Sequence, residues 1–407
     1  MRVRCALLAA GCELAPAELV WDAAGRILEL RRARRGSGPI ADQCVLPGLV
    51  DAHTHLQLDQ PLANEPAAPR DFVPWASAVM AARRDRSTAA HTAAARDAAL
   101  ARIAEGTTAI GEIDSTGCSP AALRATGIAG RCYQELVGYD LDRAGATRLV
   151  RQRRRPGALA LAAGLSPHAP YSVSAALFRA AAAASGHLAV HCAETAEEQR
   201  FLRDGTGPFA DLLRALGRMP RGAVPAGVGA VRWLARLGLL RASTQLVHCQ
   251  ELEPGDVEAI AASGAPVVVC PGTIEWFGRA APPIADWLRR GVVVALGTDS
   301  RASNAAWTMR ATLRAAARLW PELSPLRIFA LATAAGGRAL GRRLGTLQRR
   351  GRADLLALPA TSDRAGDHLE AFVHGECAVA AVRVGGRRGV GGIPALSVRR
   401  NDPTLPS

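Results

Sequence analysis

Lysine is absent from this chain of 407 residues, and all 50 of its basic residues are arginines. A carboxylated lysine therefore cannot bridge two metal ions in this protein. The arginines bring the net charge to +14, a value that suits nucleic acid or an anionic surface. They are scattered along the chain, however, and aromatic residues make up only 4% of it. We therefore attribute the charge to an alanine- and arginine-rich composition with solvated arginine side chains, and expect no nucleic-acid partner.

Long apolar runs and paired cysteines are also missing. No apolar run reaches the roughly 18 residues that a membrane span needs, so we expect no membrane segment. Residues 1–10 superficially resemble a signal peptide, but Glu13 and Glu18 follow soon after, and we interpret the segment as a first strand. The nine cysteines include no C-x-x-C spacing, and several fall on or beside predicted strands. Such thiols suit a reducing compartment, so the sequence predicts a cytoplasmic protein.

Apolar residues are plentiful, at 49%, and the length leaves room for one large barrel and a small additional domain. From residue 45 to about residue 300, apolar runs of strand length alternate with helical stretches, which is typical of a parallel α/β barrel. The eight predicted barrel strands cover residues 45–50, 107–112, 130–136, 159–165, 187–191, 244–248, 265–269 and 292–297.

The chain divides into a (β/α)8 barrel and a small β-sandwich domain that the two terminal segments build together. We predict that residues 1–44 and 346–407 form the β-sandwich domain and that residues 45–345 form the barrel. Within the barrel, residues 205–243 exceed a normal connection between strand and helix, so we expect an extra helix or lid there. Capping residues mark the starts of three helices, at Ser87, Ser174 and Thr195.

Polar residues capable of metal or proton chemistry follow four of the apolar runs. His53 and His55 end the first run at positions i and i+2, so their side chains point the same way from a strand. Two imidazoles on one side are half of a site for zinc, iron or a similar ion. The catalytic groups of a (β/α)8 barrel come from the carboxyl ends of several strands, so one shared site is predicted. The later strand ends contribute His191 with Glu194, His248, and Asp299.

The chain resembles the amidohydrolase superfamily, in the one-metal branch that includes cytosine, guanine, S-adenosylhomocysteine and aminodeoxyfutalosine deaminases. The matching segments occur in the family's order and span nearly the whole chain. They are VLPGLVDAHTHL (45–56), LSPHAPYS (165–172), HCAET (191–195), VHC (247–249), GTDSRASN (297–304), ATAAGGRALG (332–341) and GRADLLAL (351–358).

The resemblance implies one divalent metal ion, zinc in the first place and iron in the second. The absence of lysine agrees with a site for one metal rather than two. The resemblance also implies Glu194 as the proton shuttle, His248 as a second polarising base and His168 as a substrate contact. The implied metal ligands are His53, His55, His191 and Asp299, and Asp299 also takes part in catalysis.

These residue types suit hydrolysis at a carbon that bears an amine. A metal lowers the pKa of its bound water towards neutrality, which makes hydroxide available at physiological pH. Glu194 can take a proton from that water and pass it to a ring nitrogen. Asp299 can hold the remaining proton, and His248 can stabilise the developing oxyanion. The alternatives are a structural role for His168 and a helix-start carboxylate for Glu194, and the functional role is favoured over the alternative for both residues.

The chain departs from its relatives in the loops that select the substrate. Gly272 stands where many relatives have an arginine, Gln57 where they often have a glutamate, and Glu275 is an added charge. We expect Gln57, Glu275, Trp276 and Ser303 to contact the substrate, with a preference for a neutral or cationic group near Glu275. Two alternatives stay open, in which Glu275 faces solvent on the loop rim and Trp276 packs in the core.

Three functions agree with these observations. The first is hydrolytic deamination of an aminated purine or related heterocycle or nucleoside, such as aminodeoxyfutalosine. The second is another one-metal hydrolysis on the same scaffold, either dechlorination of a triazine or opening of a cyclic amide. The third is a non-catalytic assembly role, which the retained set of four metal ligands disfavours. The partner we expect is a small heterocyclic substrate, and a homo-oligomer stays open.

Overall fold

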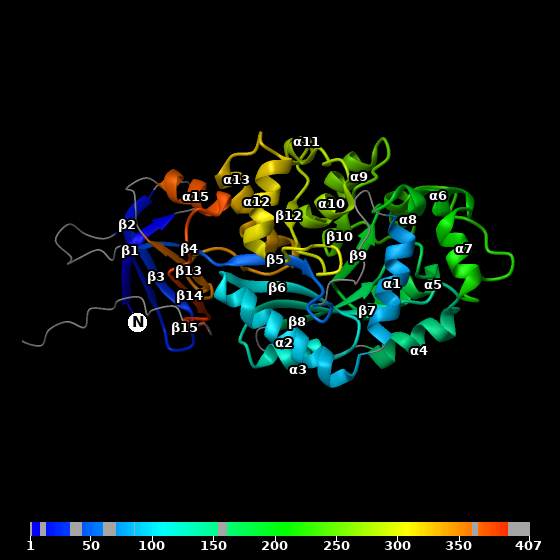
Figure 1. The fold of residues 1–407 in the computed structure, drawn as a ribbon, viewed down its shortest axis with the longest axis horizontal. Coiled ribbons are helices and arrows are strands. Elements are labelled where there is room, and N and C mark those ends of the chain that lie inside the picture. The colour runs from blue at the N-terminus through cyan, green and yellow to red at the C-terminus, as the bar shows by residue number, and fades with distance from the viewer. Residues whose placement is uncertain are drawn as a thin grey trace, which may run out of the picture.

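The computed structural model describes residues 2–8, 14–32, 43–59, 71–84, 86–153, 161–359 and 365–389. Their strands form two sheets (Figure 1), one at the left end of the view and one at its centre. Within these residues, no helix is both long and apolar enough to cross a membrane.

The central sheet has eight parallel strands in chain order, which confirms the predicted barrel. Neighbouring strands pair from the first to the eighth along the sequence. The strands are β5 (Leu49–Thr54), β6 (Thr107–Asp114), β7 (Ala129–Leu136), β8 (Leu161–Pro167), β9 (Leu188–Cys192), β10 (Thr244–His248), β11 (Val267–Val269) and β12 (Val294–Leu296).

The barrel closes where the turn after β12 meets the end of β5. The amides of Thr298 and Asp299 both donate to the carbonyl of His53 at 3.0 Å, and the amide of His55 donates to the carbonyl of Asp299 at 3.2 Å. The seam of the barrel therefore passes through residues that the sequence predicts as metal ligands.

Helices surround the barrel, and those predicted from capping residues are present. Ser87, Ser174 and Thr195 each accept a hydrogen bond from a backbone amide of the first turn, at the starts of α2, α5 and α6. The helices are α1 (Phe72–Arg84), α2 (Thr88–Ala104), α3 (Ser119–Arg124), α4 (Arg143–Arg153), α5 (Ala175–Ala184), α6 (Ala196–Asp204), α7 (Pro208–Ala215), α8 (Ala230–Arg236), α9 (Asp256–Ser263), α10 (Pro271–Phe277), α11 (Ile284–Arg289), α12 (Met309–Leu319), α13 (Pro325–Leu331), α14 (Ala334–Ala339) and α15 (Ala365–His374).

The predicted extra structure in residues 205–243 consists of α7 and α8. In Figure 1 these two helices lie at the end of the molecule opposite the terminal sheet. The largest apolar cluster fills the space between barrel and helices, with Phe178, Phe201 and Trp320 almost completely buried. Each such side chain stabilises the fold by roughly 1.5–3 kcal/mol relative to exposure.

The terminal segments build the second sheet together, as the sequence predicts. Its seven strands follow the order β15-β14-β13-β4-β1-β2-β3. They are β1 (Arg2–Leu8), β2 (Leu14–Trp21), β3 (Ile27–Arg32), β4 (Gln43–Pro47), β13 (Leu355–Pro359), β14 (Ala381–Val384) and β15 (Arg387–Arg388). A separate apolar cluster that includes Leu19, Trp21 and Leu355 packs on this sheet.

The predicted strand 45–50 is wrong in its extent. The chain forms two strands there: β4 pairs antiparallel with β13 in the terminal sheet, whereas β5 starts the barrel at Leu49. Gly48 lies between them and passes so close to β6 that a Cβ atom would lie 2.2 Å from Thr108 Oγ1. Only glycine permits this approach, which is why one apolar run serves two sheets.

Candidate metal centre and active site

Three histidines converge at the carboxyl ends of β5 and β9. The ligand atoms of His53, His55 and His191 all lie within 4.8 Å of one another, and all three side chains are buried. Neither ring nitrogen of His53 has a hydrogen-bond partner within the described residues, although the side chain is fully buried. An unpartnered buried imidazole is unfavourable unless a metal ion binds it, so these donors fit a divalent cation.

The imidazole of His191 is held in one orientation. Its Nδ1 lies 3.0 Å from the carbonyl oxygen of His168, which can only accept, so Nδ1 donates and Nε2 is left for a metal. Burial lowers the pKa of His55 to about 4 and holds that of His191 well below its usual range. Both rings are therefore neutral at pH 7, the state in which histidine binds a metal ion.

Asp299 places one carboxylate oxygen beside the histidines. Its Oδ1 lies 3.7 Å from Nε2 of His53 and 3.7 Å from Nε2 of His55. Its Oδ2 accepts hydrogen bonds from Thr273 Oγ1 at 2.9 Å and Ser303 Oγ at 2.8 Å. Burial alone would raise the pKa of Asp299, but the surrounding imidazoles hold it well below its usual range. The ionised Oδ1 completes a set of three imidazoles and one carboxylate.

Glu194 and His248 stand beside this cluster. Glu194 Oε2 lies 3.7 Å from His248 Nε2, and its Oε1 lies 3.6 Å from a guanidinium nitrogen of Arg279. Burial raises the pKa of Glu194 to about 8, although Arg279 opposes the shift. Burial also lowers the pKa of His248 to about 3. A carboxyl group with a pKa near neutrality and a neutral imidazole form a pair suited to proton transfer at physiological pH.

The start of α6 holds the backbone of Glu194. Thr195 Oγ1 accepts from the amide of Glu198 at 3.1 Å, and Glu198 Oε2 accepts from the amide of Glu194 at 2.8 Å. This reciprocal arrangement resembles a capping box, with the glutamate bonded one residue further back than usual. Glu198 is fully buried, and burial raises its pKa to about 8. The start of α6 therefore fixes the backbone of Glu194, from which the side chain extends towards His248.

Left-handed backbone conformations gather at the site. Positive φ values occur at Ala193, His248, Cys249 and Asp299, at 51°, 75°, 51° and 57°. Among described residues other than glycine, only Arg350 shares this conformation. Such strain persists where surrounding contacts over-determine the backbone, and it clusters at functional sites.

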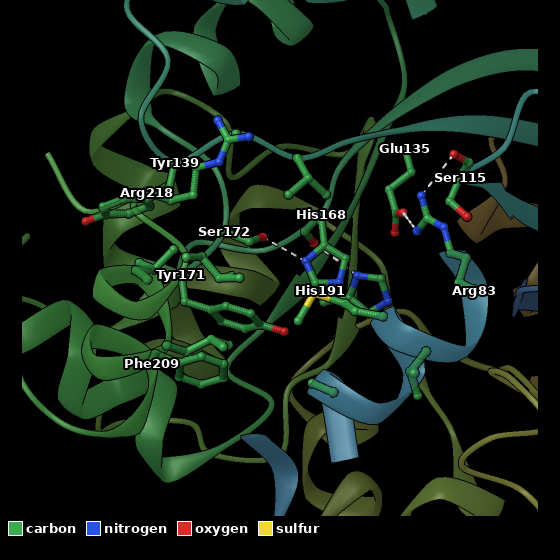
Figure 2. Close-up of a pocket in the computed structure, with 18 of the residues that line it drawn as sticks. Arg83, Ser115, Glu135, Tyr139, His168, Tyr171, Ser172, His191, Phe209 and Arg218 are labelled. Atoms are coloured by element: carbon green, nitrogen blue, oxygen red, sulfur yellow. Dashed lines mark hydrogen bonds and ion pairs between the residues drawn. The ribbon is translucent and has the colours of Figure 1, made fainter. Parts of the chain in front are cut away.

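A cavity of about 830 Å³ opens onto these residues. His55, His168, His191, Glu194, His248 and Asp299 all line it. Part of its wall comes from α1, α4 and α7. Tyr171, which lies between β8 and α5, also lines the cavity, and its ring stacks on that of Phe209 with centroids 3.9 Å apart. Figure 2 shows these two rings on the opposite side of His168 and His191 from Arg83. The volume falls within the range of small-molecule sites, and most of the wall is apolar.

Four of the five expected substrate contacts do not line this cavity; only His168 does. Gln57 is fully buried and donates to Ile113 O and Ser115 Oγ. Ser303 donates to Asp299 Oδ2, the carboxylate oxygen that does not face the histidines. Since neither side chain reaches the cavity, the expectation of direct substrate contact is corrected for both.

The same correction applies to the two residues of α10. Glu275 forms a bidentate pair with Arg318, with N–O distances of 3.0 and 2.9 Å, and is partly exposed. Trp276 is buried in an aromatic cluster with Trp75 and Phe277. The two alternatives left open by the sequence are thus the ones observed, and Glu275 does not face the cavity.

Sequence reasoning missed other polar residues of the site. Glu135 lines the cavity near the end of β7, and its Oε2 lies 3.4 Å from a guanidinium nitrogen of Arg83 on α1. Arg83 also donates to Ser115 O at 3.2 Å (Figure 2). Glu135 could have been found, because it is a carboxylate at the end of a predicted strand. Arg83 and Arg279 lie outside the barrel strands, where no pattern marks them.

Known proteins match this chain over most of its length. The amidohydrolase family matches residues 44–388. The chain is 33% identical over 359 residues to an aminodeoxyfutalosine deaminase of Deinococcus radiodurans, covering 80% of this chain and 81% of the relative. It is 28% identical over 335 residues to a 5-methylthioadenosine/S-adenosylhomocysteine deaminase of Moorella thermoacetica, covering 77% and 73%.

Two solved structures share the fold. Aminofutalosine deaminase of Helicobacter pylori superposes with a TM-score of 0.79 at 18% identity, covering 96% of this chain and all of that one. A zinc-bound adenosine deaminase of Xanthomonas campestris superposes with a TM-score of 0.73 at 22% identity, covering 95% and 92%. At these identities the structural likeness concerns the fold alone.

Proposed function

The chain belongs to the amidohydrolase family, and we propose that its activity is hydrolytic deamination of an aminated purine or related heterocycle, carried as a nucleoside derivative. The observation that supports this most directly is the Glu194–His248 pair beside three buried histidines and a carboxylate. The relatives named as deaminases of aminodeoxyfutalosine and of S-adenosylhomocysteine support the substrate class. The reaction would replace the exocyclic amine by a water-derived oxygen and release ammonia.

His53, His55, His191 and Asp299 would hold one divalent ion, zinc in the first place. Such an ion supplies a water of lowered pKa at neutral pH. The remaining chemistry belongs to the side chains. Asp299 Oδ1 faces the histidine nitrogens and can hold a proton of the attacking water. Its other oxygen is occupied by Thr273 and Ser303, which stops the carboxylate from rotating.

Glu194 would move the proton. At a pKa of about 8 it is close to balance between its two forms, so it can take a proton from water and give it to a ring nitrogen. A metal dication nearby would lower this pKa and favour the carboxylate that starts the reaction. His248 is neutral and can donate a hydrogen bond to the oxygen as negative charge develops on it.

The cavity suits a substrate larger than a bare heterocycle. It extends from His55 and Asp299 to the apolar side chains of Phe209, Leu212 and Leu213 on α7. The segment 205–243 therefore supplies part of the substrate wall, and we propose this as its role. A base at the metal centre would leave the sugar and its substituent against α1, α4 and α7.

Replacement of Glu194 by glutamine tests the mechanism. Glu194→Gln should keep its metal and bind substrate while turnover falls by about 10²–10⁴-fold, since only the proton transfer is lost. Glu197→Gln is the matched control, because that residue lies in the first turn of the helix that follows Glu194, is only partly buried and does not line the cavity. Near wild-type turnover in Glu194→Gln would show that another group moves the proton. Release of chloride or a carboxylate product without ammonia would favour the alternative hydrolyses.

A further inference from the structure

Arg102 is a buried charge that the proposed mechanism does not use. It lies on α2, on the outside of the barrel, and only 2% of it is exposed. None of its three guanidinium nitrogens has a hydrogen-bond partner within the described residues. Its ion pair is with Asp51, at 3.6 Å, on the strand that carries His53 and ends just before His55. A buried arginine with so few bonds is costly to stability, which calls for a reason beyond packing.

One route leads from Arg102 to Asp299 through Asp51. Asp51 is fully buried and accepts two hydrogen bonds from Thr298, from its amide at 3.0 Å and from its hydroxyl at 2.6 Å. Thr298 directly precedes Asp299. The hydroxyl oxygen of Thr298 also lies 3.0 Å from Thr54 Oγ1. Arg102 therefore neutralises the carboxylate that anchors the residue before the metal-facing aspartate.

A second route leads through Trp307. The guanidinium carbon of Arg102 lies 4.2 Å from the centre of the Trp307 ring, within cation–π range. The indole Nε1 of Trp307 donates to the carbonyl of Asp299 at 2.8 Å. The same carbonyl accepts from Thr54 Oγ1 at 3.1 Å. Trp307, on whose ring Arg102 stacks, therefore helps to hold the carbonyl of Asp299 in place.

Both routes end on a strained residue. Asp299 has a φ of 57°, an unfavourable conformation for a residue with a side chain. Its backbone must be held from several directions for Oδ1 to face His53 and His55. The two contacts that Arg102 supports act on the turn from opposite ends, one at Thr298 and one at the Asp299 carbonyl.

We propose that Arg102 is a positioning residue for the metal centre. From the outer helix it fixes the Thr298–Asp299 turn and thereby the direction of the Asp299 carboxylate. The inference rests on the proposed metal centre and is independent of the substrate. It predicts that loss of Arg102 weakens metal binding even though no atom of Arg102 reaches the ligands.

The test compares two buried arginines by zinc affinity, measured by competition with a chromogenic chelator on demetallated protein. Arg102→Met removes the charge and keeps an apolar stem. Arg131→Met is the control, because Arg131 is 6% exposed and donates to Leu340 O and Ala163 O, away from the metal ligands. We expect Arg102→Met to bind zinc about 10–100-fold more weakly, the scale of groups that orient ligands, and Arg131→Met to match wild type.

A second readout separates positioning from general loss of stability. Cobalt substituted for zinc should give an altered visible absorption spectrum in Arg102→Met and an unaltered one in Arg131→Met, even where both lose thermal stability. Wild-type affinity and spectrum in Arg102→Met, or equal changes in both variants, would overturn the proposal. If Arg102→Met does not fold, the test uses Trp307→Phe instead. This variant keeps an aromatic ring beside Arg102 but loses the hydrogen bond to the Asp299 carbonyl. Unchanged zinc affinity in Trp307→Phe would overturn the inference. Absence of metal binding by the wild type would instead refute the proposed metal centre.

Discussion

The hydroxyl of Ser303 provides a sharp test, because sequence and structure give it different roles. Its position in a substrate-selecting loop suggests a substrate contact, whereas the structure shows it 2.8 Å from Asp299 Oδ2 and completely buried. If it orients Asp299, Ser303→Ala should weaken metal binding. If it contacts the substrate, the same change should raise KM and leave metal binding intact.

The size of the effect follows from the geometry. A buried hydrogen bond to an ionised group contributes about 1.5–3 kcal/mol, or roughly 10- to 150-fold in an equilibrium constant. Thr273 still donates to the same oxygen at 2.9 Å, so Ser303→Ala should fall at the lower end, with about a tenfold loss of zinc affinity. Thr273→Val together with Ser303→Ala should lose on the order of 100-fold, since Oδ2 then has neither bond.

Chelator competition on demetallated protein measures these affinities, and steady-state kinetics at saturating zinc measures KM. Ser119→Ala is the control, because Ser119 is equally buried, donates to a different carboxylate, Glu112 Oε1, at 2.7 Å, and does not line the cavity. Ser303→Ala with unchanged zinc affinity and a raised KM would refute the orienting role and restore the expectation from the sequence.

Three further outcomes are expected. His53→Ala should lose stoichiometric metal by elemental analysis as well as activity, and full metal content would refute its assignment as a ligand. Burial raises the pKa of Glu198 to about 8, from an unfolded value of about 4.3. The contribution of Glu198 to folding stability is therefore lost as the pH rises from about 4.3 to about 8. Thermal melts of Glu198→Gln should therefore depend less on pH between about 5 and 8 than those of Glu197→Gln, and parallel curves would contradict the raised pKa. Leu212→Ala, on the cavity wall, should raise KM with little change in kcat, whereas Arg214→Ala, exposed on the same helix, should change neither.

The convergence of the proposed ligands could be predicted because each of these residues follows an apolar run. His53, His55, His191 and Asp299 all stand at or just after the ends of strands, where the barrel topology brings them together. The helix N-caps at Ser174 and Thr195 could also be predicted, because a cap depends on residues close together in the chain.

The cavity wall could not be predicted, because it depends on contacts between distant segments. Phe209 on α7 stacks on Tyr171, which lies before α5 in the chain, and Glu275 pairs with Arg318 on another helix. The split of the run 45–50 depends on the approach of Gly48 to Thr108, which no local pattern reveals. The proposed role of Arg102 could not be predicted either, because it depends on Asp51, far earlier in the chain, and on Trp307, far later.

The most direct test of the proposed deamination is product analysis in water labelled with oxygen-18. Purified zinc-loaded protein would be incubated with a panel of aminopurines, aminopyrimidines and their nucleosides, with ammonia measured in parallel with the mass of the product. We expect a purine nucleoside derivative to yield one ammonia per product, and we expect the product to carry one oxygen from the solvent. A product without solvent oxygen, or turnover of a panel compound without release of ammonia, would contradict the proposed deamination.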